Sequence, residues 1–225
     1  MTQGIGATVE AISQNFAAGP IEQTGSALDL AINGDGFFTM RAASDGQTLF
    51  TRNGSFTLDG QGQVHDGSGN YLQGFAVAGG VPGGALATAA GPIPVPATTP
   101  NSTATPPPAF TGLTVGGDGS MVASYDDGSN YAVAVVAVAS FVSPGGLRQV
   151  GSSDWAATGI SGPPALGQPG QGQFGALMSG ALERSNVDIA EELVGLITAQ
   201  RNFQANAKAI DTATQISQTI INLRT

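Results

Sequence analysis

The clearest hydrophobic pattern in the chain lies in its last segment, Ser185 to Thr225. Apolar residues recur there at three- and four-residue spacing, which places them on one side of an α-helix. They are Ile189, Leu193, Leu196, Phe203, Ala207 and Ile210, and the final third repeats the spacing at Ala209, Ala213, Ile216, Ile220 and Leu223. The segment holds no proline and one glycine, Gly195. The pattern therefore predicts one long C-terminal helix.

The ends of this segment suit a helix. The Ser185 hydroxyl can cap free backbone N–H groups, while Asp188 and Glu191 favour the positive helix end and Arg224 the negative end. Such a helix would be about 55–60 Å long, roughly twice the width of a domain of this size. Its apolar side then needs a partner outside the chain's own core. A second interpretation is that the helix bends at Gly195 and folds back over the preceding domain.

A short helix is also predicted near the start of the chain, over residues 7–18. Val9, Ile12 and Phe16 would share one face, and Gly19-Pro20 would end the helix. The pattern then changes to short runs rich in β-branched and aromatic residues. Glycine-containing turn dipeptides recur between these runs every 8 to 12 residues or so, which favours antiparallel β-structure.

The runs predict a series of strands. They are 27–32, 37–41, 48–52, 55–58 and 71–78, followed by 113–115, 121–125 and 131–141. The turn sequence at 33–36 and the Asn53-Gly54 dipeptide predict that the flanking strands run back against each other. The run 131–141 is long enough to cross the centre of a sheet.

Two segments lack strand signals. Residues 97–110 lie within a region that holds most of the chain's prolines, and they read as an extended connector. Residues 144–175 are rich in glycine and proline, and we expect an irregular segment anchored by Trp155. The fold class is thus mainly β, an antiparallel β-rich middle domain with a long C-terminal α-helix. Residues 1–96 and 111–184 form the two parts of the β-rich domain, and residues 185–225 form the helix.

Composition excludes several classes of function. Charged residues make up 10% of the chain and the formal net charge is −9, with Lys208 the single lysine. Phosphate backbones and anionic membrane surfaces both require clustered cations, so we expect no nucleic-acid partner and no membrane association. No run of about 20 apolar residues exists, and the first residues lack the parts of a signal peptide. There is no cysteine, hence no disulfide and no thiolate metal site.

Candidate chemistry is sparse. The single histidine, His65, sits at a turn and reads as a solvated loop residue, so neither a histidine-based metal site nor a catalytic triad is predicted. The sequence 170–175 matches the Gly-x-Gly-x-x-Gly dinucleotide fingerprint, but Gly167-Gln168-Pro169 before it cannot be a central strand. Aspartates occur beside glycine, as turn-forming residues do. We predict no catalytic residue, no cofactor and no metal.

Two long stretches resemble a known family. The first is Gln23 to Phe38, QTGSALDLAINGDGFF, followed by Thr51 to Phe56, TRNGSF. The second is Ser185 to Val194, SNVDIAEELV, followed by Ala199 to Lys208, AQRNFQANAK. Together they resemble the central and C-terminal motifs of the bacterial flagellar rod and hook family. Residues 139–147 and 175–183 are most similar to the hook branch, with the distal rod branch as the alternative.

The resemblance implies a fold and a function. Family members have a β-rich middle domain flanked by N- and C-terminal helices, which pair into a coiled coil lining the channel of a tube. We therefore expect a non-enzymatic structural subunit of the flagellar hook, polymerising into a curved universal joint that passes torque from rod to filament. The alternative is a distal rod protein, which forms a straight drive shaft. Export would use the flagellar type III apparatus, and the chain would reside in the extracellular hook, serving motility.

Partners and packing residues follow from the same resemblance. We expect self-association into a helical polymer and contacts with other axial proteins, namely rod, hook-cap and hook–filament junction proteins, without membrane insertion. The predicted packing residues of the tail are Val187, Leu193, Val194, Ile197, Phe203, Ile210, Ile216, Ile220 and Leu223.

Two departures from the family pattern modify these expectations. The helical segment with which family members begin has no counterpart before Thr2, so we expect a fragment or an unusual start, mostly monomeric in dilute solution and with a frayed tail. Hook proteins also carry an outer domain inserted into the β-rich domain. Residues 97–110 are the equivalent place in this chain, and they are too short to form a domain.

Overall fold

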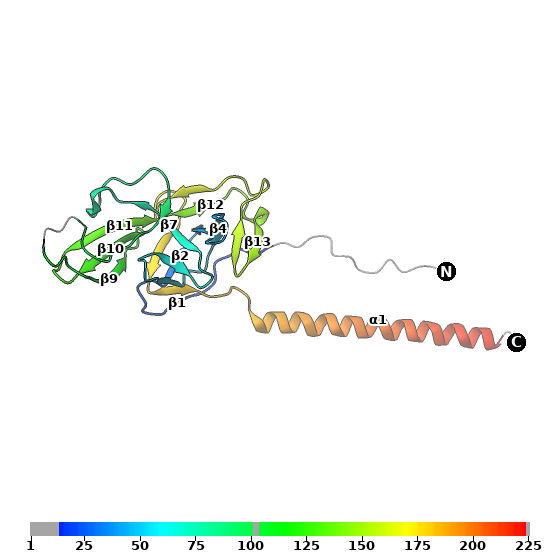
Figure 1. Ribbon diagram of the computed structural model, residues 1–225. Coiled ribbons are helices and arrows are strands. Elements are labelled where there is room, and N and C mark those ends of the chain that lie inside the picture. Colours follow the sequence, from blue (N-terminus) through cyan, green and yellow to red (C-terminus); the bar gives the residue numbers. More distant parts are fainter. Residues whose placement is uncertain (1–13, 101–103, 224–225) are drawn as a thin grey trace. The chain divides into compact units, whose positions relative to one another are not determined.

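A computed structural model describes residues 14–100 and 104–223, with the side chains of Ile221 and Leu223 excepted. The chain divides into two compact units, a β-unit (Met1–Arg184) and a helical unit (Ser185–Thr225). The β-unit is built from short antiparallel strands, and the helical unit holds one long helix, α1 (Ile189–Leu223) (Figure 1). The predicted fold class, mainly β with a long C-terminal helix, is confirmed.

The strands form one large sheet and two small ones. In the large sheet the main path follows the order β13-β14-β4-β3-β7-β11-β10-β9. These strands are β3 (Phe37–Arg41), β4 (Thr48–Thr51), β7 (Tyr71–Ala76), β9 (Phe110–Val115), β10 (Ser120–Tyr125), β11 (Asn130–Val136), β13 (Arg148–Gly151) and β14 (Asp154–Ala156). Strands beside the path are β5 (Phe56–Leu58), β6 (Val64–Asp66), β8 (Gly91–Pro92), β12 (Val138–Ser140) and β15 (Ala165–Gly167). Figure 1 shows β9–β11 at one end of the β-unit and β13 at the other.

The two small sheets join segments that are far apart in sequence. β1 (Ile21–Gln23) pairs with β17 (Ala181–Glu183), and β2 (Leu30–Asn33) pairs with β16 (Ala176–Ser179). Two short 3-10 turns, Ala78–Gly80 and Pro144–Gly146, complete the β-unit. The last strands before the helical unit are therefore held by the first strands of the β-unit.

The β-unit has a main core and a smaller aromatic core. Side chains such as Leu30, Phe38, Met40 and Met121, all fully buried, fill the main core. The aromatic core holds Phe37, Phe50, Ala139, Phe141 and Leu147, with Phe16 and Trp155 packed against it. Its rings meet edge to face, with centroids 4.8 Å apart for Phe50 and Phe141, the geometry that aromatic quadrupoles favour.

The predicted strands exist, but two predicted pairings are wrong. β4 already has β3 on one edge and β14 on the other, so β5 pairs with β6 instead of turning back at Asn53-Gly54. Gly54 also lacks the positive φ of a tight hairpin turn; a Cβ there would lie 1.6 Å from the Leu30 carbonyl oxygen. Glycine is needed at this position because another backbone approaches closely.

The second wrong pairing concerns the turn at 33–36. β2 does not pair with β3, because the chain passes at Gly34 and Gly36, both with positive φ, from one sheet to another. The long predicted strand 131–141 is also divided in two, β11 and β12, which separate at Ala137. The backbone of Ala137 remains bonded, since its N–H donates to the Gln73 carbonyl.

Residues 144–175 are more regular than expected. They contain β13, β14 and β15, and Trp155 lies on β14 rather than in an irregular segment. Tertiary pairing overrides the glycine- and proline-rich composition here. Most of the predicted helix 7–18 lies outside the described residues; its described end, residues 14–18, is not helical, because Phe16 packs in an irregular segment against Phe37 and Trp155.

Helix α1 begins one turn later than Ser185 would allow. Asp188 is the N-cap, since its Oδ1 accepts a hydrogen bond from the Ala190 N–H at 2.8 Å. The Ser185 hydroxyl instead accepts from the Val187 N–H, before the helix. The helix continues through Gly195, where an added Cβ would meet no atom of another part of the chain within 4 Å.

Candidate assembly surface

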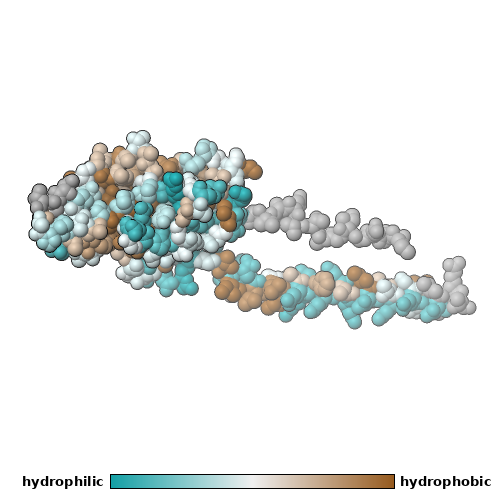
Figure 2. Space-filling model, in the orientation of Figure 1, coloured by the Kyte–Doolittle hydropathy of each residue, from teal (hydrophilic) through white to brown (hydrophobic). Residues whose placement is uncertain are grey.

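The described large apolar side chains of α1, from Ile189 to Ile220, are exposed. Exposed fractions are 52% for Leu193, 75% for Phe203, 65% for Ile210 and 61% for Ile220. Figure 2 shows apolar patches alternating with polar ones along this helix. Isolated exposed apolar residues are ordinary, but a sustained row of large ones marks an interaction surface.

The exposed residues form two stripes rather than one. The first stripe is Ile189, Leu193, Leu196, Phe203 and Ile210, and the second is Ala213, Ile216 and Ile220. At about 100° per residue the second stripe is centred about 130° around the helix from the first, and Ile210 and Ala213, where the two stripes meet, are about 60° apart. The shift arises because a seven-residue repeat drifts around a straight helix by about 20° per heptad and because the second stripe starts one position earlier in the repeat. The helix thus offers two contact surfaces.

The predicted packing residues divide accordingly. Leu193, Ile197, Phe203 and Ile210 lie on or beside the first stripe, and Ile216 and Ile220 lie on the second. Val194 lies between the stripes and is 64% exposed. Val187 is not in the helix but in the segment that precedes it. Leu223 is the last helical residue, and its side chain lies outside the described ones.

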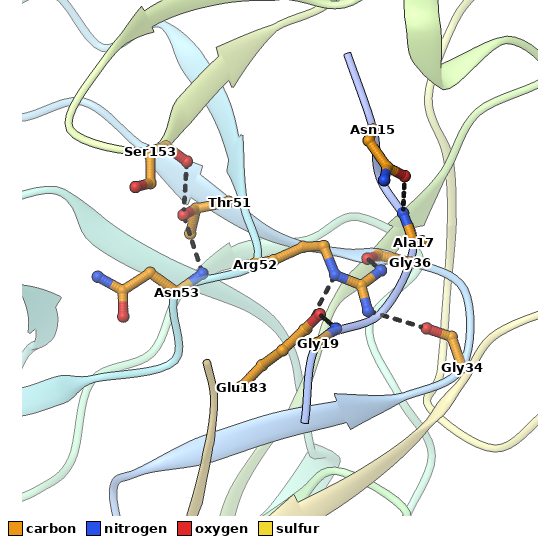
Figure 3. Close-up of polar contacts among 10 residues, drawn as sticks. All are labelled: Asn15, Ala17, Gly19, Gly34, Gly36, Thr51, Arg52, Asn53, Ser153 and Glu183. Carbon is orange, nitrogen blue, oxygen red and sulfur yellow. Dashed lines mark hydrogen bonds and ion pairs between the residues drawn. The ribbon is translucent and has the colours of Figure 1, made fainter. Parts of the chain in front are cut away.

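The last strand of the β-unit takes part in a polar cluster that sequence reasoning missed. Glu183, the last residue of β17, forms an ion pair with Arg52, with Nε and Oε2 2.9 Å apart and side-chain exposures of 16% for Arg52 and 9% for Glu183. The other Glu183 oxygen accepts a hydrogen bond from the Gly19 N–H at 2.9 Å. Figure 3 shows the Glu183 carboxylate between these two donors. The segment just before β1, the end of β17 and the chain after β4 therefore meet at one carboxylate.

Arg52 uses its remaining N–H groups locally. They donate to the carbonyls of Gly36 and Gly34 (Figure 3). The guanidinium also lies 5.9 Å from the centre of the Phe37 ring. Its neighbour Thr51 donates a hydroxyl hydrogen bond to the Ser153 carbonyl and accepts one from the Asn53 N–H. The sequence offered one sign of this cluster, which is the presence of Arg52 in a chain that has only seven lysines and arginines.

A second polar cluster joins two buried acids. The Asn70 amide donates to Asp66 at 3.1 Å and to Asp154 at 3.0 Å. Burial, and then the negative charge of Asp66, raise the pKa of Asp154 to about 6, although hydrogen bonds from Thr51 and Asn70 oppose the shift. Asp66 also caps the loop before β7 by accepting from the N–H groups of Ser68 and Asn70. The contacts of this cluster thus hold the loop before β7 against β14.

Sites for chemistry are few in the described part of the chain. His65 is not a solvated loop residue; it lies on β6, half-buried, with Nδ1 2.7 Å from the Asp66 carbonyl oxygen and Nε2 3.3 Å from the Thr57 hydroxyl. Within residues 14–100 and 104–223 no three histidine, cysteine or acidic side chains gather as metal ligands would. No helix among these residues is long and apolar enough to cross a membrane.

Comparison with known proteins identifies two matching family models. Residues 31–123 match the flagellar hook protein FlgE/F/G D1 domain, and residues 178–223 match the C-terminal domain of the flagellar basal body rod FlgEFG proteins. The first match lies in the β-unit, and the second covers its last strands and α1.

Two groups of relatives match over different lengths. The flagellar basal-body rod protein FlgG of Bacillus subtilis is 32% identical over 222 residues, which cover 98% of this chain and 74% of the relative. The FlgG of Caulobacter vibrioides is 33% identical over 89% of this chain and 66% of the relative. The flagellar hook protein FlgE of Salmonella typhimurium is 44% identical over 110 residues, which cover 49% of this chain and 27% of the relative. The chain therefore belongs to the flagellar rod and hook family, the axial structural proteins of the bacterial flagellum.

Proposed function

We propose that this protein is a subunit of the distal rod, the straight drive shaft, and acts by polymerisation rather than by catalysis. The observation that carries this proposal is the extent of similarity: rod proteins match over nearly the whole chain and about three quarters of their own length, whereas a hook protein matches over 27% of its length. This reverses the order of the sequence-based expectation, in which the hook came first.

The connector supports the same choice. Thr98 and Ala109 form a β-bridge, the Thr99 N–H donates to the Pro108 carbonyl and the Phe110 N–H donates to the Ala97 carbonyl. The two ends of residues 97–110 are therefore hydrogen-bonded to each other. The segment is too short for the outer domain that hook proteins carry at this place, which favours the rod. We assign residues 1–96 and 111–184 to one β-rich domain around this connector, and residues 185–225 to an inner coiled-coil domain.

The helix surface supports assembly. The two stripes face different sides of α1 and each exposes large aliphatic side chains, whose burial against another surface would be favourable. We propose that the predicted packing residues serve this purpose, with one stripe facing a helical segment of the same subunit and the other facing neighbouring subunits. The partners are copies of the chain and adjacent axial proteins, and the protein reaches the flagellum through the type III apparatus.

A hook subunit is the second candidate. The observation in its favour is local identity, 44% over 110 residues, which exceeds that of the rod relatives. A hook subunit would sit outside the cell in a curved tube, whereas a distal rod subunit would sit within the basal body.

The location experiment separates the two candidates. Antibodies against the β-unit would be applied to isolated hook–basal bodies of the source bacterium and followed by gold labelling in electron microscopy. Labelling of the rod after the outer rings are removed is the expected result. Labelling along the curved hook would overturn the rod assignment in favour of the hook, and labelling of neither would overturn both.

The assembly experiment tests the helix surface. Leu193→Asp combined with Ile210→Asp in the full-length protein should abolish its incorporation into flagella and motility, because both charges would fall on the first stripe. The matched control, Thr212→Asp with Thr219→Asp, adds the same charge at exposed positions between the two stripes and should be tolerated. Normal incorporation of the first variant would refute the assignment of the packing residues.

A further inference from the structure

The β-unit carries an apolar projection that its own core does not use. Val142 is 94% exposed and Ile160 is 80% exposed, although both are β-branched aliphatic residues. They lie on two neighbouring loops, since the Ser143 N–H donates to the Ser161 carbonyl. We call Val142 and Ile160 with these loops the knob.

The knob is held in one shape by its own hydrogen bonds. The Thr158 hydroxyl donates to the Gly146 carbonyl at 2.6 Å and accepts from the Ile160 N–H at 3.1 Å, while the Ser161 hydroxyl donates to the Thr158 carbonyl. Ser161 is fully buried, and a Cβ on Gly146 would lie 2.6 Å from the Ser161 nitrogen. Exposed aliphatic side chains on a pre-formed loop lose little conformational entropy on binding, which favours docking.

An apolar groove lies elsewhere on the same unit. Two adjoining hollows of about 320 and 260 Å³ share Leu86 and Gln168. Val122 and Val135 line the first, and Leu166 and Phe174 line the second. Neither Val142 nor Ile160 lines the groove. The register of β12 with β15, Ser140 opposite Ala165 and Val138 opposite Gly167, places the knob and the groove beyond opposite ends of that strand pair.

We propose that the knob of one subunit docks into the groove of a second copy of the chain. Charge complementarity argues for this occupant. Asp118 is the only charged residue that lines the groove, and hydrogen bonds from the Ser120 hydroxyl and N–H lower the pKa of its carboxyl, which keeps it ionised. Arg148, exposed directly after the first knob loop, is the only charged residue of residues 141–149 and 157–163.

The geometry of such a contact is head to tail. Since knob and groove are different surfaces, each copy can donate its knob to one neighbour and receive the knob of another, and the series does not have to close. The inference rests on the proposed function, because it gives the axial polymer a specific contact between β-units.

The test uses engineered cysteines, since the natural chain has none. Val142→Cys and Val122→Cys would be combined in one chain and oxidised gently at high protein concentration. A disulfide requires Cα atoms within about 7 Å, so it reports direct docking. The expected result is a ladder of dimers, trimers and larger species on a non-reducing gel. Adding Arg148→Glu should lower the yield of the ladder by up to about fivefold.

Three controls keep the result decisive. Val142→Cys alone and Val122→Cys alone should form no ladder, and Val142→Cys with the exposed Ser44→Cys should form none either; the melting temperature of each variant should match that of the natural chain. Absence of the ladder in the main variant, or an equal ladder from the Ser44 pair, would overturn the proposal. Rapid dimerisation of Val142→Cys alone would also overturn it, because the contact would then be symmetric. The assay needs only purified chain, so its failure is distinct from a failure to find the subunit in the rod.

Discussion

Phe50 and Phe203 show how differently the two units use the same kind of side chain. Phe50 is 1% exposed on β4 and meets the Phe141 ring edge to face, whereas Phe203 is 75% exposed on the first stripe of α1. The β-unit buries most of its large apolar side chains in its own core, whereas the helical unit leaves its apolar side chains exposed to solvent. We therefore expect the β-unit to fold by itself and the helix to be completed by association, as proposed above.

The largest effect should come from Gly54→Ala in the β-unit. The new Cβ would overlap the Leu30 carbonyl oxygen, and the β2 backbone would have to move. We expect a loss of at least about 4 kcal/mol of unfolding free energy. Urea denaturation followed by the fluorescence of Trp155, the single tryptophan, measures it. Gly60→Ala, with nothing within 4 Å, is the control and should cost little; comparable losses in both would remove the steric explanation.

The phenylalanine comparison gives the next effect. Phe50→Ala should destabilise the β-unit by about 3–5 kcal/mol, because it leaves a cavity in the aromatic core. Phe203→Ala should change the same unfolding transition by less than about 0.5 kcal/mol, while it weakens assembly. A large shift of the Trp155 transition by Phe203→Ala would mean that the two units are not independent in stability.

The Arg52–Glu183 ion pair should contribute a smaller amount. Arg52→Met leaves the Glu183 carboxylate largely buried without its cation, which we expect to cost about 2–3 kcal/mol in urea denaturation. The control is Arg184→Met, because Arg184 pairs with Glu22 at 67% and 61% side-chain exposure, and it should cost less than about 0.5 kcal/mol. Equal costs would show that burial does not distinguish the two pairs.

The acid pair predicts a pH dependence. The pKa of Asp154 in the folded protein, about 6, exceeds its ordinary 3.8, so the folded state keeps a proton that the unfolded chain has already lost between these values. Stability should therefore fall as pH rises from about 4 to about 6 and then level off. Asp154→Asn should raise the melting temperature at pH 7.5 by about 2–4 °C and give no gain at pH 4. A gain that is the same at both pH values would contradict the titration.

The smallest effect repeats the glycine substitution in the other unit, with the opposite sign. Gly195→Ala should stabilise α1 by up to about 1 kcal/mol, because Gly195 is inside the helix with open space around it. We expect the dilute chain to be a monomer with a frayed tail, so circular dichroism at 222 nm should increase in the variant. A wild-type monomer whose tail is already fully helical would show no increase and would refute the fraying.

Local pattern predicted the elements of this protein better than their partners. The apolar repeat of α1 and strands such as 37–41 depend on residues close together in the chain. These elements were predicted at the positions where the structure has them. The partners of β2 and β4 depend on segments more than 100 residues away, β16 and β14, and a local turn sequence such as Asn53-Gly54 cannot report them. The same holds for β13–β15, whose composition resembles a loop.

The assembly surface was partly predictable for the same reason. Residues such as Leu193 and Ile210 could be selected by spacing alone, but the rotation of the second stripe away from the first follows only if the helix is unbroken. The Arg52–Glu183 pair joins positions 131 residues apart and has no local signature. The sequence also led us to expect Ser185 as the N-cap, whereas Asp188 has that role. Either side chain can cap a helix, and the choice depends on where the backbone turns into the helix.

The pairing of β1 with β17 has a mechanical consequence. Ile21 lies opposite Glu183, so the first and last described strands of the β-unit are adjacent, about 4.8 Å apart. In the drive shaft proposed above, a load that arrives through β1 or through β17 would reach the β-unit at the same place, where the Glu183 carboxylate binds Arg52 and the Gly19 N–H. A torque would then act on the β-unit at the β1–β17 pair alone. The rest of the β-unit could rotate as a rigid body without its other strand pairs being pulled apart.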